Sequence, residues 1–187
     1  MKRIIVLCLL ITITLMGCAT WVAVKGKYSM SSQNFEVEIP DGWRRFNLSR
    51  DALIITKDGL SLQQINIMRR AIDKELPHTK KKLSKEMMPQ EVSEVIIDNI
   101  RSNPSIMNQQ FIENAPAQIG GYSGIKIVYT YQTKVGLTKK GVNYCFMFGN
   151  WCYEIIYEAP ERHYFGKDLL AFKQIVESFR LIKTTVS

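Results

Sequence analysis

The sequence predicts an α+β fold in which an antiparallel sheet of about six strands is flanked by two main helices, with a secretion signal in front. The first observation behind this prediction is a series of short segments that alternate apolar and polar residues, as strands with one buried face do. The second is a pair of segments with apolar residues at helical spacing. The third is a positively charged start followed by an apolar run. A sandwich of helices and sheet buries all of these apolar faces.

The N-terminal segment has the features of a secretory signal, because Lys2 and Arg3 precede a short apolar run. That run ends in Leu15-Met16-Gly17-Cys18, which resembles the lipobox of bacterial lipoproteins. In a lipobox a small residue precedes the cysteine that receives a thioether-linked diacylglycerol. The resemblance implies that residues 1–17 are a signal peptide. It also implies that Cys18 is the acylated first residue of the mature protein, with palmitate among its chains.

An uncleaved membrane anchor is the alternative, because no charge appears from Ile4 to Val24 and about twenty apolar residues can span a bilayer. Small residues interrupt this run, which favours the shorter signal. Both interpretations export the body of the chain and hold it at a membrane. Two or more acyl chains anchor a protein stably. Under the sorting rule for lipoproteins, Ala19 favours the periplasmic face of the outer membrane if the source is Gram-negative.

Composition indicates one basic domain after cleavage. Removing Lys2 and Arg3 from the 25 basic residues leaves 23 against 17 acids, a formal charge of about +6. The remaining chain of about 170 residues suits one domain with a sizeable core. We expect a lipidated tether over residues 18–27 and the domain over residues 28–187. Nucleic acid is not an expected partner, because an exported domain rarely meets it.

The first half of the domain predicts strands and turns. Phe35, Val37 and Ile39 alternate with glutamates, which indicates a half-buried strand, and Pro40-Asp41-Gly42 predicts a turn directly after it. Further strands are expected over residues 43–46, 52–56 and 62–69. The pattern then ends in a loop over residues 70–85.

That loop contains Lys80, Lys81 and Lys82, which form the densest basic cluster of the chain together with Lys74 and Lys85. The three consecutive lysines are candidates for contact with anionic lipid headgroups, each worth about 1 kcal/mol near such a surface. A solvated loop without a partner is the alternative interpretation.

Two segments predict the helices. Pro89 suits the first turn of a helix, and an apolar stripe continues to Ile100 before Asn103-Pro104 ends it. This helix can cover one face of the sheet. A closing amphipathic helix is marked by apolar residues at Phe165, Leu169, Phe172, Val176 and Phe179.

Between these helices, three alternating segments predict an antiparallel meander whose aromatic side chains share one face. The strands are centred on residues 125–131, 142–148 and 151–157. Gly149-Asn150 fits a two-residue hairpin turn. In that register Phe148 faces Trp151 and Phe146 faces Tyr153, so the aromatic side chains of the hairpin lie on the same side.

Cys145 and Cys152 remain as candidates for a disulfide once the signal is removed and Cys18 is acylated. With the turn at Gly149-Asn150 they are diagonal neighbours, which is poor disulfide geometry. A turn one residue earlier would place them directly opposite, but would misalign the aromatic pairs. The oxidising envelope favours the bridge. Bridged and free thiols therefore both remain open.

Three parts of the domain together resemble the PsbP-like fold. They are Phe35 to Trp43, Gly120 to Lys126 with Trp151 to Ala159, and Phe172 to Leu181. This fold is an α/β/α sandwich shared by a photosystem subunit, a Ran-binding nuclear import factor and many small bacterial lipoproteins. The resemblance implies that architecture over nearly the whole mature chain. It also implies a binding or assembly module, and it supplies no catalytic residues.

The residues themselves indicate no catalytic chemistry. The chain contains no H-E-x-x-H, no G-x-S-x-G and no Walker loop. Glu161, His163 and Asp168 are conceivable metal ligands, but a solvated helix start is the preferred interpretation. We expect no enzyme, no cofactor and no metal.

The sequence thus predicts a lipid-anchored cell-envelope protein that acts as a non-catalytic binding or assembly module, with a protein of the envelope as its partner. The alternative is a carrier or sensor of a small apolar ligand, and it depends on the aromatic face of the meander. Packed under a helix, that face is core. Left partly open, it would form a groove lined by Tyr129, Tyr144 and Tyr153.

Overall fold

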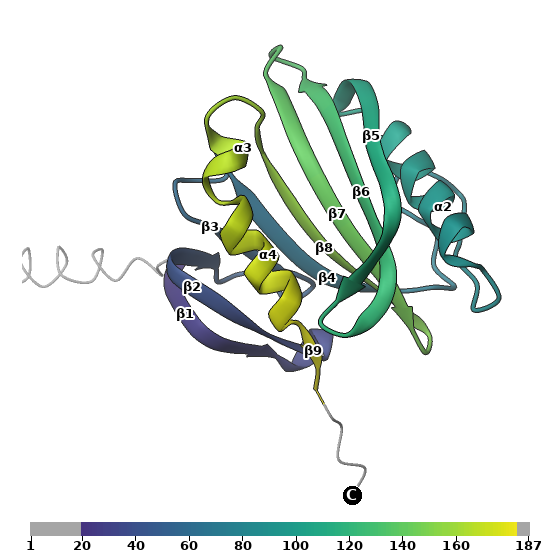
Figure 1. The fold of residues 1–187 in the computed structure, drawn as a ribbon, viewed down its shortest axis with the longest axis horizontal. Coiled ribbons are helices and arrows are strands. Elements are labelled where there is room, and N and C mark those ends of the chain that lie inside the picture. The colour runs from purple at the N-terminus through teal and green to yellow at the C-terminus, as the bar shows by residue number, and fades with distance from the viewer. Residues whose placement is uncertain (1–19, 183–187) are drawn as a thin grey trace, which may run out of the picture.

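The computed structural model describes residues 20–182 (Figure 1). Its strands are β1 (Trp21–Met30), β2 (Phe35–Phe46), β3 (Leu53–Thr56), β4 (Gln64–Ala71), β5 (Ile106–Ile119), β6 (Tyr122–Thr133), β7 (Thr138–Phe148), β8 (Trp151–Pro160) and β9 (Arg180–Leu181). Its helices are α2 (Pro89–Arg101), α3 (Tyr164–Lys167) and α4 (Leu169–Ser178), with a 3₁₀ turn at Ser31–Gln33. The predicted signal peptide and Cys18 lie outside the described residues.

One antiparallel sheet organises these elements. Its strand order is β1-β2-β3-β4-β8-β7-β6-β5, and β9 pairs with β2. The predicted α+β class is confirmed, but the sheet has nine strands where about six were expected. The predicted strands correspond to β2, β3, β4, β6, β7 and β8. The sequence analysis missed β1, β5 and β9.

β1 occupies residues that were expected in the tether. It pairs along the length of β2, from Trp21 opposite Phe46 to Met30 opposite Phe35. The uncharged run to Val24 continues the composition of the leader, so hydropathy alone did not reveal where the strand begins. The first strand therefore starts at residue 21 and not at the predicted domain boundary of 28.

β2 is one continuous strand where two strands and a turn were predicted. Pro40-Asp41-Gly42 lie within it, opposite Lys25, and the pairing with β1 shifts between Val24 and Gly26. The predicted turn is instead a bulge, which accommodates a proline without an N–H and Gly42 at a φ of 90°.

β5 is a long edge strand without a clear period. It pairs with β6 through two register shifts. Polar residues at Asn108, Gln109 and Gln110 interrupt the alternation, and Pro116 is tolerated because an edge strand has one unpaired side. An irregular edge strand of this kind gives almost no periodic signal.

Helices cover both faces of the sheet and give the expected α/β/α sandwich. α2 packs against β5 and β6 on one face, and α4 crosses the other face against β2 and β5 (Figure 1). We call these the α2 face and the α4 face. Each has its own apolar cluster, centred on Val92 and Ile96 of α2 and on Phe172 and Ile175 of α4. Both predicted helices form, although the closing one is divided into α3 and α4 at Asp168.

The β7–β8 hairpin has the predicted register. Phe148 lies opposite Trp151 and Phe146 opposite Tyr153, with Gly149-Asn150 as the turn. A two-residue turn fixes which residues face each other, so local sequence was sufficient here.

The prediction of one aromatic face for the whole meander is wrong. Tyr129 of β6 lies on the α2 face, whereas Tyr153 of β8 belongs to the core of the α4 face and Tyr144 of β7 packs against that core. Tyr129 pairs with Gly141 of β7. The connection between β6 and β7 is longer than a two-residue turn, so the sequence did not reveal this register. Tyr153 and Phe146 of the hairpin are almost completely buried in the core of the α4 face, together with Phe172 of α4. The predicted groove lined by Tyr129, Tyr144 and Tyr153 therefore does not form.

Candidate functional site

On the α2 face, polar side chains of the inner strands β4 and β8 lie close together. α2 packs against β5 and β6, at the other end of this face. A cavity of about 290 Å³ lies over β4, β7 and β8, and we call it the polar cleft. His78, Asn99 and Asn103 stand at its rim, from the basic loop, α2 and the segment after α2. Its principal polar side chains are Asn66, Arg70, Tyr129, Asn143, Glu154 and Glu158.

Strand register brings these side chains together. Asn66 of β4 pairs with Ile156 of β8, and Ile156 pairs with Asn143 of β7. The three residues form a row across the sheet, with an apolar side chain between two amides. Because side chains alternate between faces, Glu154 and Glu158 lie on the same face as Ile156, one on each side of it along β8. The cleft thus has an apolar centre between two carboxylates.

Glu158 is held by tyrosine and glutamine donors. The Tyr129 hydroxyl donates to Glu158 Oε1 at 3.0 Å, and Gln64 Nε2 donates to Glu158 Oε2 at 2.8 Å. Tyr129 reaches the carboxylate by lying over Gly141, where an added Cβ would come within 2.5 Å of the ring. Burial and the nearby Glu158 carboxylate raise the pKa of Tyr129 well above its ordinary value. The same causes raise the pKa of Tyr131, so both hydroxyls remain protonated donors.

Glu154 is a buried carboxylate whose lost hydration is only partly offset by its partners. Its side chain is 8% exposed, and its Oε2 accepts a hydrogen bond of 2.9 Å from Asn143 Nδ2. Arg70 Nη2 is 3.8 Å from Oε1, at the outer limit of an ion pair. A buried carboxylate needs close donors to offset its lost hydration. Glu154 therefore retains capacity to accept a further donor.

Unpaired polar atoms distinguish the polar cleft from the rest of the described molecule. Four buried side-chain atoms in residues 20–182 lack a hydrogen-bond partner, and three of them belong to cleft residues. These three are Asn66 Oδ1, Asn143 Oδ1 and Arg70 Nε. Buried polar atoms in folded proteins are almost always paired with protein or water. Three such atoms in one cavity indicate a site where an external polar group completes the hydrogen bonding.

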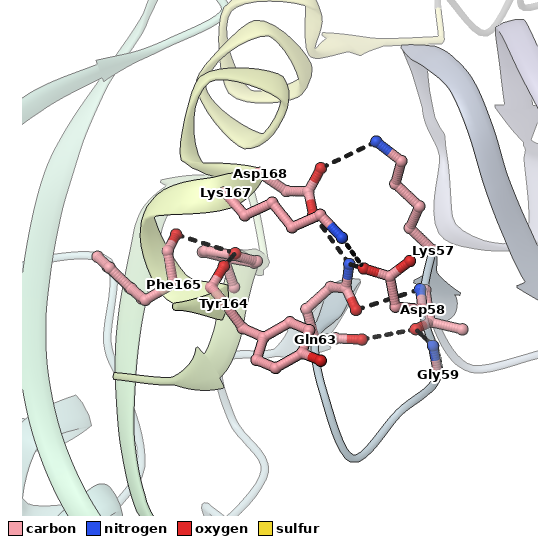
Figure 2. A network of polar contacts seen from close by, with 10 residues as sticks. Lys57, Asp58, Gly59, Gln63, Tyr164, Phe165, Lys167 and Asp168 are labelled. Atoms are coloured by element: carbon pink, nitrogen blue, oxygen red, sulfur yellow. Dashed lines mark hydrogen bonds and ion pairs between the residues drawn. The ribbon is translucent and has the colours of Figure 1, made fainter. Parts of the chain in front are cut away.

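A second polar network, at the β3–β4 loop, is closed on itself (Figure 2). The buried Asp168 carboxylate accepts from Lys57 Nζ at 3.1 Å and from Gln63 Nε2 at 2.9 Å. Gln63 and Lys167 also donate to Asp58, which ties the loop to α3 and α4. Each carboxylate has two partners, so the network is a structural clamp and presents no unpaired acceptor of the kind found in the polar cleft.

This network corrects one expectation. Asp168 was interpreted as part of a solvated helix start with Glu161 and His163, but it is only 4% exposed and paired with Lys57. Among residues 20–182, no three His, Cys, Asp or Glu side chains are grouped so that they could hold a metal ion.

The sequence-predicted site residues are dispersed. Cys18 lies outside the described residues. Lys80, Lys81 and Lys82 are exposed, and Lys81 pairs with Asp98 of α2. Buried leucines at positions 76 and 83 fix the loop on either side of these lysines.

The two cysteines are brought together. Cys145 and Cys152 are diagonal neighbours, as the register predicted, and are buried beside α2 as free thiols. Their sulfur atoms are nevertheless 2.8 Å apart, closer than the expected poor geometry implied.

Sequence reasoning missed the polar cleft because it assigned the polar positions of the meander to solvent. Asn143 and Glu154 do alternate with apolar residues, but β7 and β8 are central strands with helices on both faces of the sheet. Because both faces of a central strand are normally covered, a polar residue on either face is the signal that could have indicated the cleft. Nothing local connects these residues to Asn66 and Arg70, which come from β4.

Comparisons with known proteins bear on the fold. No protein-family model and no curated protein matches the chain. Solved structures do match, among them the cyanobacterial PsbP of Synechocystis sp. PCC 6803, CyanoP, with a TM-score of 0.58 and 13% identity over 89% of this chain and 95% of that chain. The Ran-binding protein Mog1p of Saccharomyces cerevisiae has a TM-score of 0.59 and 7% identity over 86% of this chain and 96% of that chain.

LpqN of Mycobacterium tuberculosis, described as involved in cell envelope biogenesis, has a TM-score of 0.54 and 15% identity over 79% of this chain and 83% of its own. The chain spans 50% of the length of a further similar structure, from Bacteroides thetaiotaomicron VPI-5482. No helix in the described part of the chain is long and apolar enough to cross a membrane.

The class of protein is therefore an α+β domain whose helices enclose one antiparallel sheet with a polar cleft on it. Its fold is PsbP-like, as the sequence resemblance implied. At these identities the comparisons define the fold alone.

Proposed function

We propose that this chain is a lipid-anchored protein of the cell envelope that acts as a non-catalytic binding module, with the polar cleft as its binding site. The observation that carries the proposal is the set of unpaired atoms Asn66 Oδ1, Asn143 Oδ1 and Arg70 Nε around one cavity. Leaving buried polar groups unpaired costs free energy. A bound polar group would recover that energy, which makes binding the function that the cleft suits best.

Two structural neighbours support a binding role on this fold. Mog1p is a Ran-binding protein, and LpqN is involved in cell envelope biogenesis. Their identities to this chain are 7% and 15%, so their partners are not carried over to it.

The proposed lipid anchor has a geometric consequence. β1 begins at Trp21, so only Ala19 and Thr20 separate it from Cys18. Acyl chains on Cys18 would hold the β1 edge of the sheet against the membrane and restrict which partners can reach the cleft. Intact-mass spectrometry of protein extracted from membranes should find residues 1–17 removed and acyl mass on Cys18. An intact Met1 end would replace this proposal with an uncleaved anchor.

Site-specific photocrosslinking in cells tests the binding role. A photoreactive amino acid at Met68, a half-buried residue of the cleft, should yield adducts detectable by mass spectrometry, whether with a small molecule or with a protein. The matched control is the same amino acid at Leu170, which is 70% exposed on α4. Adducts specific to Met68 support the cleft as the binding site. The same adduct pattern at both positions, or none at Met68, would refute it.

A further inference from the structure

The charges and unpaired atoms of the polar cleft also define the chemistry of a ligand, and this step rests on the binding role proposed above. We infer that the cleft binds a small aliphatic group that ends in an ammonium or guanidinium. Such a group is present on free amines and on lysine or arginine side chains of a partner. Four features of the cleft lead to this class of ligand.

The first feature is a pair of unpaired amide oxygens. Asn143 donates through Nδ2 to Glu154, which fixes its amide so that Oδ1 faces away from the carboxylate without a partner. Asn66 Oδ1 is unpaired on the other side of Ile156. A ligand that brings several N–H donors would satisfy both of these amide oxygens. Ammonium and guanidinium groups have donors and no acceptors.

The second feature is charge. Glu154 and Glu158 supply two carboxylates to the cleft, and Arg70 supplies one positive charge. With His78 neutral, the cleft has a formal charge of −1, in a protein whose whole chain has +8. Charge-assisted hydrogen bonds are about twice as strong as neutral ones. A monocation would balance this local excess of negative charge.

The third feature is the shape of the apolar surface. Ile156 and Met68 lie between the polar groups and are half-buried. They can contact the methylene chain of an aliphatic amine. The rings of Tyr129 and Tyr131, with centroids 6.0 Å apart, border the same cavity and provide aromatic surfaces that favour a cation. At about 290 Å³ the cavity is at the small end of ligand sites, so the ligand is small or is a single side chain.

The fourth feature is polarity along the cleft. Arg70 lies four residues beyond Asn66 on β4 and pairs with Cys152, so it lines the end of the cavity away from Glu158, and its Nε donor is unpaired. A cation is repelled there, and a ligand atom that accepts hydrogen bonds is favoured. The cationic end of the ligand should therefore lie between Asn66, Asn143 and Glu158.

Isothermal titration calorimetry of the purified full-length protein tests the inference with 4-guanidinobutan-1-ol as the probe, because it carries one guanidinium and ends in a hydroxyl that can accept a hydrogen bond. This probe should bind with a dissociation constant below about 1 mM. Asn66→Leu and Glu158→Gln should each weaken binding about tenfold or more, since each removes a hydrogen bond to the charged group. Asn66 makes no side-chain hydrogen bond among the described residues, so its leucine variant should fold, and circular dichroism verifies this for both variants.

Controls separate the outcomes. Glu161→Gln removes the same charge at an exposed position outside the cleft and should leave binding of 4-guanidinobutan-1-ol unchanged. A blocked Gly-Arg-Gly peptide distinguishes the sources, because binding of the peptide without binding of the free guanidine assigns the cleft to a partner's side chain. Tighter binding of glutarate than of 4-guanidinobutan-1-ol, or no binding of either cationic probe, would overturn the inference. Adducts at Met68 in that case would leave the binding role intact with another class of ligand.

Discussion

The Sγ atoms of Cys145 and Cys152 lie 2.8 Å apart across β7 and β8, although the two residues are diagonal and not directly opposite. The right-handed twist of a sheet shortens one diagonal of each residue pair, which explains how this register brings the sulfurs together. Both side chains are almost fully buried. A hydrogen bond with Cys152, followed by burial, raises the pKa of the Cys145 thiol. In the folded protein this thiol is therefore a poor nucleophile.

We predict that protein isolated from an oxidising envelope contains the Cys145 to Cys152 disulfide, formed before the core closes. Peptide mapping under denaturing conditions without reductant should find these two cysteines linked. A bridge across so short a loop should contribute about 2–3 kcal/mol, so reduction should lower the unfolding temperature by several degrees. Alkylation of both cysteines in unreduced, unfolded protein would contradict the prediction.

Lys80 and Lys82 should contribute to membrane binding more than Lys81, which is paired with Asp98. A chain expressed without its first eighteen residues should co-sediment with anionic vesicles at low salt. Replacing Lys80 and Lys82 with alanine should weaken this binding roughly thirtyfold, at about 1 kcal/mol for each lysine. Lys134→Ala with Lys173→Ala is the matched control, because both are exposed elsewhere. An equal effect of the two double variants would mean that the basic loop is only solvated.

Gly141→Ala should destabilise the protein by displacing Tyr129. An added Cβ would lie 2.5 Å from the ring of Tyr129, whose hydroxyl donates the hydrogen bond to Glu158. Overpacking of this kind costs about 1–3 kcal/mol, and urea denaturation would measure it. Gly166→Ala is the control, because no atom lies within 4 Å of its added Cβ. Equal loss of stability in both variants would show that Tyr129 is not confined by Gly141.

Asp58 should make stability depend on pH in the acid range. The hydrogen bond from Lys167, followed by that from Gln63, lowers the pKa of Asp58 below its ordinary value of 3.8. A group with a lowered folded pKa stabilises the protein above its unfolded pKa and loses this contribution as the pH falls through the folded pKa. Asp58→Asn should therefore be less stable than the wild type at pH 7, with the difference shrinking below about pH 4.

Thermal unfolding across this pH range would measure the effect of Asp58. Asp51→Asn, at an exposed aspartate outside the network, should show a constant and small difference from the wild type. A difference for Asp58→Asn that does not change between pH 7 and pH 2 would contradict the proposed pairing.

Local sequence was sufficient wherever contiguous residues determine the structure. The stripe from Pro89 to Ile100 predicted α2, and the alternation around Gly149-Asn150 predicted both strands of the hairpin and their register. A helix stripe and a two-residue turn involve only neighbours within a few positions. The same local method failed at β1 and β5. Val22 and Val24 continue the leader in composition, and the bulges of β5 remove the alternation.

The polar cleft required the tertiary structure. Asn66 and Arg70 of β4 meet Glu154 and Glu158 of β8 through pairing between strands more than eighty residues apart in the chain. Each of these residues has an ordinary period-two context, in which a polar position is normally solvent-exposed. Whether such a polar side chain faces water or a cavity depends on which helix covers that part of the sheet. α2 packs against β5 and β6 and leaves the region over β4 and β8 open as the polar cleft.

The sequence by itself thus determined the α+β class, the location of the six inner strands and the two main helices. It is also the basis for the proposed export and lipidation at Cys18. Only the tertiary structure decided that Tyr129 shares a face with Asn143 and not with Tyr153, and that a cleft with unpaired polar atoms forms beside it. The physical reason is that periodicity and turns are properties of short segments. The face of a sheet, its cover and its cavities result from long-range strand pairing, which no short segment specifies.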